Sequence, residues 1–134
     1  MVDPGVLISG LISAKGAPRS LLWLWLEGSF EVIVCPALLA ELERVLLRSK
    51  FRSYVTAPEV RAYVALLQRL SSVERDPVIK AGLTPDPGDD YLVALARAAG
   101  AHFIVSGDPH LTELKQARPP VLTPRAFLRR LASR

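Results

Sequence analysis

Short apolar runs alternate with stretches of helical spacing along this chain, and this alternation constrains the fold more than any other feature. Glu31 to Cys35 and His102 to Val105 have the length and the β-branched residues of strands. The stretches between them place apolar residues three and four positions apart, as on one face of an α-helix. Strands that alternate with helices are typical of an α/β domain with a parallel sheet, and we expect that fold class here.

Three segments carry apolar stripes that predict helices packed on the sheet. The stripes are Leu38, Leu42, Val45 and Leu46 in the first, Val60, Tyr63, Val64 and Leu67 in the second, and Leu92, Val93 and Ala96 in the third. Pro58 and Glu59 favour the start of the second helix. Val121 to Thr123 predicts a short last strand, and Pro124 predicts the start of a basic C-terminal helix.

Length and composition indicate one soluble domain. At 134 residues the chain can bury one substantial core, so we expect a single domain over residues 1–134. No run reaches the ~18 apolar residues of a membrane span. The apolar stretch from Val6 to Ile12 lacks the basic segment and the cleavage pattern of a signal peptide. The single cysteine, Cys35, cannot form an internal disulfide, which fits a reducing cytoplasm.

The chain is net basic, with 17 Lys and Arg residues, 13 Asp and Glu residues and a formal charge of +4. Its basic residues gather in two clusters, Arg44, Arg48, Lys50 and Arg52 in one, and Arg125, Arg129, Arg130 and Arg134 in the other. Such clusters favour a polyanionic partner. A solvated helix face explains them equally well, so charge alone leaves the choice open.

Two segments are apolar almost all round. Leu21 to Leu26 has no polar residue, and Leu92 to Ala99 is interrupted only by Arg97. A helix of this kind is either buried inside the molecule or covered by a partner. The sequence therefore suggests a homodimer, with internal burial as an equal alternative.

Each acidic residue that precedes a helical segment can be explained as a helix cap. Asp followed by Pro is an ordinary helix start. The pair occurs at Asp3, Asp76, Asp86 and Asp108. Asp89 and Asp90 would then lie in the first turn of their helix, where the helix dipole favours negative charge. For any one of these residues alone, capping is the simpler explanation.

The same acids taken together predict a site. Parallel strands end at one edge of a sheet, so Asp3 and Asp108 should be neighbours, and the first turn of the next helix would bring Asp89 to the same crevice. Two carboxylates about 5 Å apart at an effective dielectric of about 20 repel by roughly 3 kcal/mol. Since no Lys or Arg is adjacent to them in sequence, a divalent metal ion is the simplest neutraliser.

Helix geometry predicts which way some of these acidic side chains point, toward the site or toward water, but it does not decide for all of them. Asp90 shares its helical stripe with Arg97, which predicts a side chain facing water, whereas Asp89 shares a face with apolar residues and should point toward the sheet. Glu41 and Glu43 flank the apolar stripe of their own helix at comparable angles. Spacing leaves both of them open as site residues.

Four motifs follow one another in a recognisable order. They are Asp3 leading into Val6-Leu-Ile-Ser-Gly-Leu-Ile12, Pro36-Ala-Leu-Leu-Ala-Glu41-Leu after a strand, Asp86-Pro-Gly-Asp89-Asp-Tyr-Leu, and Val105-Ser-Gly-Asp108-Pro-His-Leu. In this order they resemble the PIN-domain ribonucleases, specifically the toxin-like PIN proteins of prokaryotic toxin-antitoxin pairs. The resemblance covers essentially the whole chain, and the combination is specific although each motif alone is weak.

The resemblance implies a three-layer α/β/α fold with a central parallel sheet of about five strands. It also implies an acidic cluster that is catalytic and holds Mg²⁺ or Mn²⁺, formed by Asp3, Glu41, Asp89 and Asp108. Glu41 is preferred to Glu43 because it stands where such proteins place their helix glutamate. Asp86 would be an outer-shell acid, and Ser106 would be the small hydroxyl that accompanies the last aspartate.

The activity that the resemblance implies is metal-dependent cleavage of RNA. A carboxylate-held metal would activate a water molecule that hydrolyses the phosphodiester. Single-stranded RNA is favoured because a narrow acidic crevice must admit one strand, and its backbone would be held by the cluster Arg44, Arg48, Lys50 and Arg52. A cognate antitoxin would be expected to cover the site.

Two features depart from the family pattern. Pro4-Gly5 follows Asp3 where family members commonly have Thr-Asn, and only Met1 and Val2 precede Asp3, which predicts a short first strand or a start further upstream. The first departure supports an alternative hypothesis, in which the chain is a weak or noncatalytic PIN-like module. Such a module would bind RNA or a protein, and its acids would serve as helix caps. A nucleotide-binding α/β protein ranks last, because neither common phosphate loop is present.

Overall fold

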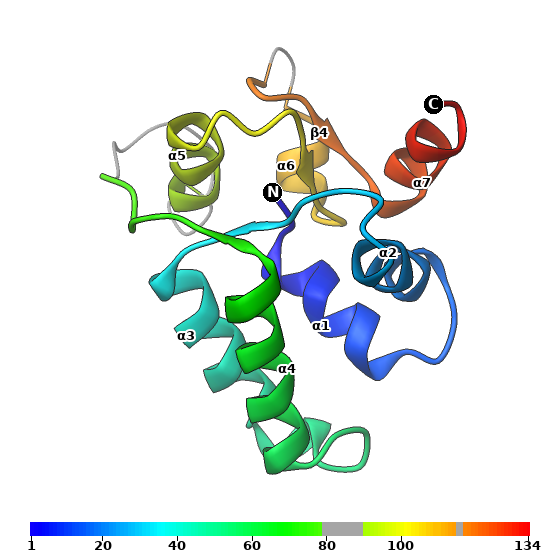
Figure 1. Cartoon of the computed structure of the whole chain (residues 1–134), viewed down its shortest axis with the longest axis vertical. Coiled ribbons are helices and arrows are strands. Elements are labelled where there is room, and N and C mark those ends of the chain that lie inside the picture. Colours follow the sequence, from blue (N-terminus) through cyan, green and yellow to red (C-terminus); the bar gives the residue numbers. More distant parts are fainter. Residues whose placement is uncertain (79–89, 115–116) are drawn as a thin grey trace.

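The computed structural model describes residues 1–78, 90–114 and 117–134 (Figure 1). Its helices are α1 (Pro4–Ile12), α2 (Ala17–Leu26), α3 (Pro36–Leu46), the 3-10 turn η1 (Ser49–Phe51), α4 (Ala57–Leu70), α5 (Asp90–Ala98), α6 (Pro109–Thr112) and α7 (Pro124–Ala132). Its strands are β1 (Ile33–Val34), β2 (Ser72–Val73), β3 (Ile104–Val105) and β4 (Val121–Leu122). Helices separate the strands along the chain, as in an α/β fold, although α1 is followed by α2 and α3 by α4 with no strand between them.

The strands are short and form two separate pairs. β1 pairs in parallel with β2, with Ile33 opposite Ser72, and β3 pairs in parallel with β4. A single parallel bridge joins Val2 to Val105. The parallel pairing agrees with the sequence-based prediction. A single sheet of about five strands is not seen in the residues that the structure describes, and β2 has no counterpart in that prediction because Ser72–Val73 is too short to show a pattern.

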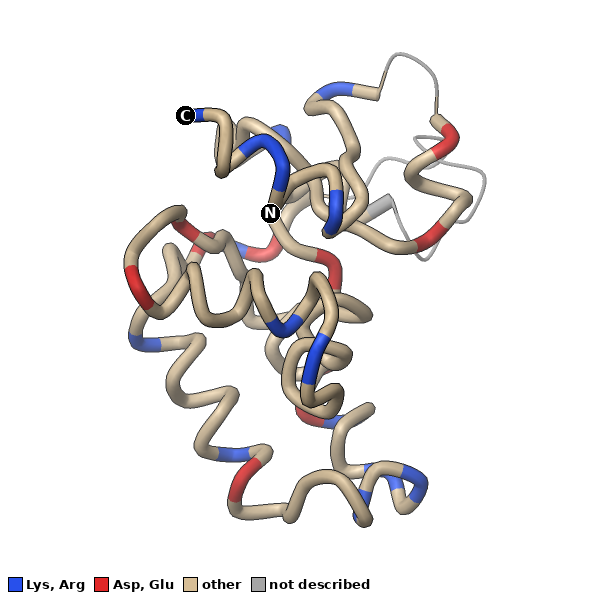
Figure 2. The backbone as a smooth tube through the Cα atoms, turned by 90° about the vertical axis from the view of Figure 1, so that its right-hand side faces the viewer, with Lys and Arg blue, Asp and Glu red and all other residues tan. Residues whose placement is uncertain are grey.

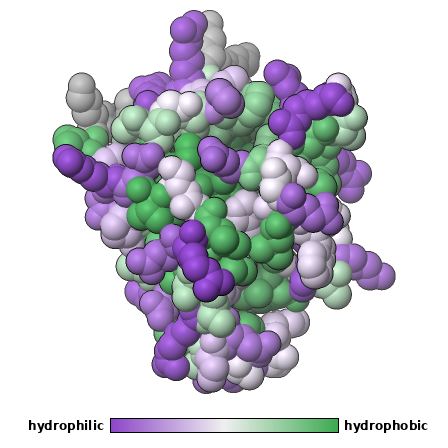
Figure 3. Space-filling view, in the orientation of Figure 1, coloured by the Kyte–Doolittle hydropathy of each residue, from purple (hydrophilic) through white to green (hydrophobic). Residues whose placement is uncertain are grey.

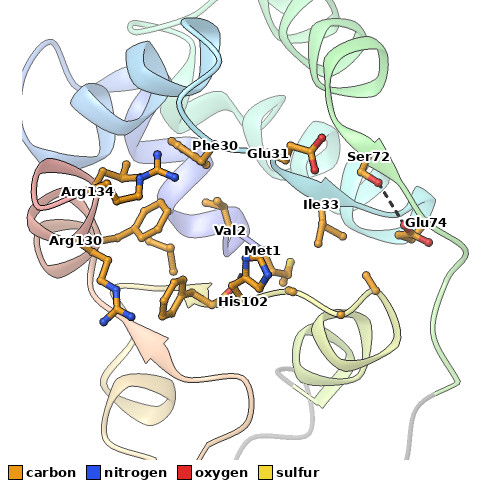
Figure 4. A pocket seen from close by; sticks show the side chains of 17 residues that line it. Met1, Val2, Phe30, Glu31, Ile33, Ser72, Glu74, His102, Arg130 and Arg134 are labelled. Carbon is orange, nitrogen blue, oxygen red and sulfur yellow. Dashed lines mark hydrogen bonds between the residues drawn. The ribbon is translucent and has the colours of Figure 1, made fainter.

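A cavity of about 830 Å³ separates the two strand pairs. Figure 4 shows Ile33 of β1 on one side of this space and Met1 and His102 on the other. The edge of β1 and the edge at Val2 therefore face each other across a gap instead of exchanging backbone hydrogen bonds. The predicted short first strand is present only as the bridge from Val2.

The helices pack on one another around a shared core. α1 contacts α2 and α3, α3 contacts α4, and α2 contacts α7. Figure 1 shows α1, α3 and α4 on one side of the short strands and α5 on the other. The predicted apolar stripes are buried at Leu38, Leu42, Leu46, Val60, Tyr63, Leu67, Leu92, Val93 and Ala96. Apolar side chains gather near the middle of the face seen in Figure 3, and hydrophilic ones follow its outline.

The start of α4 differs slightly from the prediction. The helix begins at Ala57, one residue before Pro58, because Thr56 forms a capping box with Glu59. The Thr56 hydroxyl accepts from the Glu59 N–H at 3.3 Å, and the Glu59 carboxylate accepts from the Thr56 N–H at 3.0 Å. These two bonds satisfy two backbone N–H groups at the start of the helix.

The apolar helix α2 is mostly covered from inside the molecule. Leu21 and Trp25 are buried, and α1 and α7 pack against this helix. Trp23 and Leu26 remain 57% and 40% exposed. Internal burial therefore accounts for one face of α2, and dimerisation stays a prediction for the other. In the described ranges, no helix is both long and apolar enough to cross a bilayer.

Candidate active site

Asp3 lies where the bridge to β3 ends and α1 begins. Its backbone N–H donates to the Val105 carbonyl at 2.9 Å, which fixes it beside β3. Its Oδ1 accepts from the Gly5 N–H at 3.0 Å, in the manner of an N-cap. The capping predicted for Asp3 is confirmed, and it uses only one of the two carboxylate oxygens.

Ser106 joins Asp3 to Asp108. It follows β3 directly and is fully buried. Its hydroxyl donates to Asp3 Oδ2 at 2.6 Å and accepts from the Asp108 N–H at 3.0 Å. The two aspartates that end neighbouring parallel segments are thus connected through one hydroxyl, although they lie 105 positions apart in sequence.

Asp108 forms the more open side of this group. It is the N-cap of α6, and its Oδ1 accepts from the His110 N–H at 2.9 Å. The His110 ring nitrogen Nδ1 lies 3.8 Å from the same oxygen. The Asp108 side chain is 36% exposed, so a ligand can approach it from solvent. Its predicted capping role is also confirmed.

Glu41 is held from a different helix. It lies in the middle of α3, and its Oε2 accepts from the Tyr91 hydroxyl at 2.5 Å. Tyr91 is half-buried near the start of α5. Burial and the Glu41 carboxylate raise the pKa of Tyr91, so the phenol keeps its proton.

The carboxylates are close enough to influence one another. The pKa of Asp3 lies above its ordinary value of 3.8, chiefly because the carboxyl is buried and further because of the Asp108 and Glu41 charges. Hydrogen bonds from Ser106 and Gly5 act in the opposite direction. Within the described part of the chain, no Lys or Arg forms an ion pair with an acid, and only the His110 ring approaches the Asp108 carboxylate. Negative charge therefore gathers here with little basic compensation.

The donors suit a hard divalent cation. Carboxylate oxygens are the ligands that Mg²⁺ and Mn²⁺ prefer in proteins. Among the described residues, however, no three acids, histidines or cysteines lie close enough to hold a metal by themselves. The predictions for Asp86 and Asp89 lie outside the described residues, as does the predicted orientation of the Asp90 side chain. Asp3 and Asp108 would thus supply part of a ligand set, for which Asp89 is a predicted further member.

The first basic cluster lies at the far end of α3 and in the turn that follows. All four of its members are exposed: Arg44, Arg48, Lys50 and Arg52. Arg52 donates to the Leu47 carbonyl at 3.2 Å, and the Lys50 ammonium lies 5.0 Å from the centroid of the Phe51 ring. Figure 2 shows basic positions gathered at this end of the molecule. Their role in binding RNA stays a prediction.

A PIN-domain family model matches residues 1–110, a span that contains all four predicted acids. The chain belongs to the PIN-domain family. PIN domains have an α/β fold and are commonly metal-dependent nucleases that act on RNA. Comparisons with curated proteins and with solved structures find no significant match. Family membership therefore supports the α/β fold class of this PIN domain, and it indicates which activity is common in the family, that of a metal-dependent nuclease.

Sequence reasoning did not find two residues that shape this PIN-domain site. Tyr91 was overlooked although it directly follows the Asp89-Asp90 pair. Asp76 was interpreted as the cap of a helix starting at Pro77, which is wrong, because residues 74–78 are neither helix nor strand. Instead Asp76 Oδ1 accepts from the Ala37 N–H at 2.8 Å and caps α3 from across the fold. No local pattern could reveal a contact that spans 39 residues.

Proposed function

We propose that this PIN domain is a divalent-cation-dependent endoribonuclease. The observation that carries the proposal is the convergence of Asp3 and Asp108 on the Ser106 hydroxyl, with Glu41 near enough to raise the pKa of Asp3. Carboxylates that lie close together in a partly buried site repel one another, which is costly unless a cation neutralises them. The family match adds that a nuclease centre is the common use of such acids.

In this proposal the acids have distinct roles. Asp3, Glu41, Asp89 and Asp108 hold Mg²⁺ or Mn²⁺, and Asp86 supports them from outside the ligand set. The cation would supply acidification of a water molecule and stabilisation of charge on the phosphate. Ser106 fixes the separation of Asp3 and Asp108 through its two hydrogen bonds. Asp3 is hydrogen-bonded to β3 and Asp108 caps α6, so both carboxylates are attached to hydrogen-bonded backbone.

The substrate is proposed to be single-stranded RNA. The exposed cluster Arg44, Arg48, Lys50 and Arg52 would bind the phosphate backbone, and the affinity should fall as salt is added. We further propose one domain over residues 1–134, a toxin role in the cytoplasm, and a cognate antitoxin that covers the acids. A homodimer could bury the exposed Trp23 and Leu26 of α2.

The experiment is cleavage of labelled single-stranded RNA by purified protein with Mg²⁺ or Mn²⁺, compared with EDTA. Glu41→Gln and Asp108→Asn should abolish cleavage. Glu43→Gln is the matched control, because it makes the same chemical change two residues away on α3 and should leave cleavage intact. Cleavage that persists in EDTA, or that survives Glu41→Gln, would show the proposal to be wrong.

A second candidate is a noncatalytic module that binds RNA or a protein. It is favoured by one observation: Asp3 and Asp108 both cap helices, at 3.0 Å to the Gly5 N–H and 2.9 Å to the His110 N–H. This module would bind no divalent cation and cleave no RNA. Asp108→Ala, which removes the cap, would then lower stability with no other effect, whereas the nuclease proposal requires a loss of cleavage at unchanged fold in Asp108→Asn.

A further inference from the structure

Tyr91 occupies a position that neither the family match nor the predicted acid set explains. It is the second residue of α5 and lies two positions after Asp89 in sequence. Its hydroxyl reaches across to α3 and donates to Glu41 Oε2 at 2.5 Å. The bond therefore links the helix that follows the Asp89 motif to the helix that carries Glu41.

The bond restricts a side chain that would otherwise be mobile. A glutamate has three rotatable side-chain bonds, and fixing them costs conformational entropy. Tyr91 engages Oε2 and leaves the other carboxylate oxygen, Oε1, without a side-chain donor among the described contacts. A carboxylate fixed through one oxygen can present the other in a constant direction, as partners of metal-ligating carboxylates do.

The geometry makes the tyrosine the donor in this contact. Tyr91 is half-buried, and its hydroxyl is directed at Glu41 Oε2. A phenol O–H facing a carboxylate oxygen donates to it, so the direction of the hydrogen bond is fixed. Bonds to an ionised acceptor are also stronger than neutral ones.

We propose that Tyr91 is a positioning residue, which orients the Glu41 carboxylate for cation binding and for cleavage of RNA. The inference rests on the proposed nuclease function and adds to it a residue outside the acids. Tyr91 acts through Glu41 and does not touch the reacting atoms. Removal of its hydroxyl should loosen Glu41 while leaving the ring and its packing in place.

The test compares Tyr91→Phe with Tyr63→Phe. Tyr63 is a matched control because its hydroxyl also donates to a single acceptor, the Leu7 carbonyl, at 2.9 Å, on the buried face of α4. Each variant loses one hydroxyl and keeps its ring. The readouts are Mn²⁺ affinity by calorimetry, single-turnover cleavage of RNA, RNA affinity in EDTA, and the unfolding temperature of the cation-free protein.

Tyr91→Phe should weaken Mn²⁺ binding and slow cleavage by about tenfold to a hundredfold, with unchanged RNA affinity. Tyr63→Phe should lower the unfolding temperature and change neither Mn²⁺ affinity nor the cleavage rate. In a Glu41→Gln background, Tyr91→Phe should change Mn²⁺ affinity no further. Wild-type affinity and cleavage in Tyr91→Phe, or equal losses in both variants, would overturn the positioning role while the nuclease proposal stands. A wild-type protein that neither binds Mn²⁺ nor cleaves RNA would overturn both.

Discussion

At the scale of single residues, the site depends on one buried hydroxyl. Ser106 is the only polar residue among the fully buried side chains of the described chain, and both of its hydrogen bonds serve the acids. A hydroxyl placed between two carboxylate-bearing residues can satisfy both without adding charge. The Ser106 hydrogen bond therefore offsets part of the cost of burying the Asp3 carboxylate beside Asp108.

Ser106→Ala should destabilise the protein by about 1–3 kcal/mol, since it leaves the Asp108 N–H and the Asp3 carboxylate short of a partner. Urea unfolding measures the change. Ser71→Ala is the control, because the Ser71 hydroxyl is buried without a hydrogen-bond partner among the described residues, and its removal should cost little. Equal effects of the two substitutions would contradict the linking role of Ser106.

Asp3 should make stability depend on pH in a defined direction. Its pKa is raised in the folded protein, so the folded state holds the proton more tightly than the unfolded state does. Without a divalent cation, this group's contribution to the free energy of unfolding should fall as pH rises above the ordinary value of 3.8 and through the raised folded value. Asp3→Asn keeps an acceptor for the Gly5 N–H and should remove this dependence.

Urea unfolding of the wild type and of Asp3→Asn, in EDTA at several pH values, measures this pH dependence of stability. The variant should gain stability over wild type as the pH rises toward neutrality. A constant difference, or one that shifts in favour of wild type with rising pH, would show that burial of Asp3 carries no charge penalty.

At the scale of elements, the helices were more predictable than the strands. Apolar stripes such as Leu38, Leu42 and Leu46 repeat over several turns, so α3 could be inferred from local spacing. Each strand is two residues long and is defined by its partner, and partners such as β1 and β2 are far apart in sequence. Local sequence patterns do not indicate which strands pair, so β2 could not be predicted from the sequence.

The contact between Asp76 and α3 joins two segments that are far apart in sequence. Its Oδ1 accepts from the Ala37 N–H, one of the orphan donors at the start of the helix that carries Glu41. Asp76→Ala should cost about 1 kcal/mol, the usual loss for an N-terminal cap. Asp76→Asn retains an acceptor and should cost less. Chemical denaturation of both variants provides the comparison, and an equally small effect of both would contradict the capping role.

At the scale of the whole molecule, the fold brings together residues that the sequence keeps apart. Asp3 and Asp108 could be paired from the rule that parallel strands end at one edge, and the structure joins them through Ser106. The approach of Glu41 was implied by the family resemblance and not by spacing, because Glu41 and Glu43 flank their stripe similarly. Its partner Tyr91 reaches Glu41 through a hydrogen bond between residues that lie 50 positions apart, which no local pattern encodes.

The measurement that tests this account most directly is the unfolding temperature as a function of Mn²⁺ concentration, without RNA. A ligand that binds only the folded protein stabilises it by mass action, by about 2.7 kcal/mol at a hundred times its dissociation constant. We expect a steady rise of the unfolding temperature for wild type and none for the double variant Glu41→Gln/Asp108→Asn. No rise for wild type, or the same rise in both proteins, would contradict a cation site formed by these carboxylates.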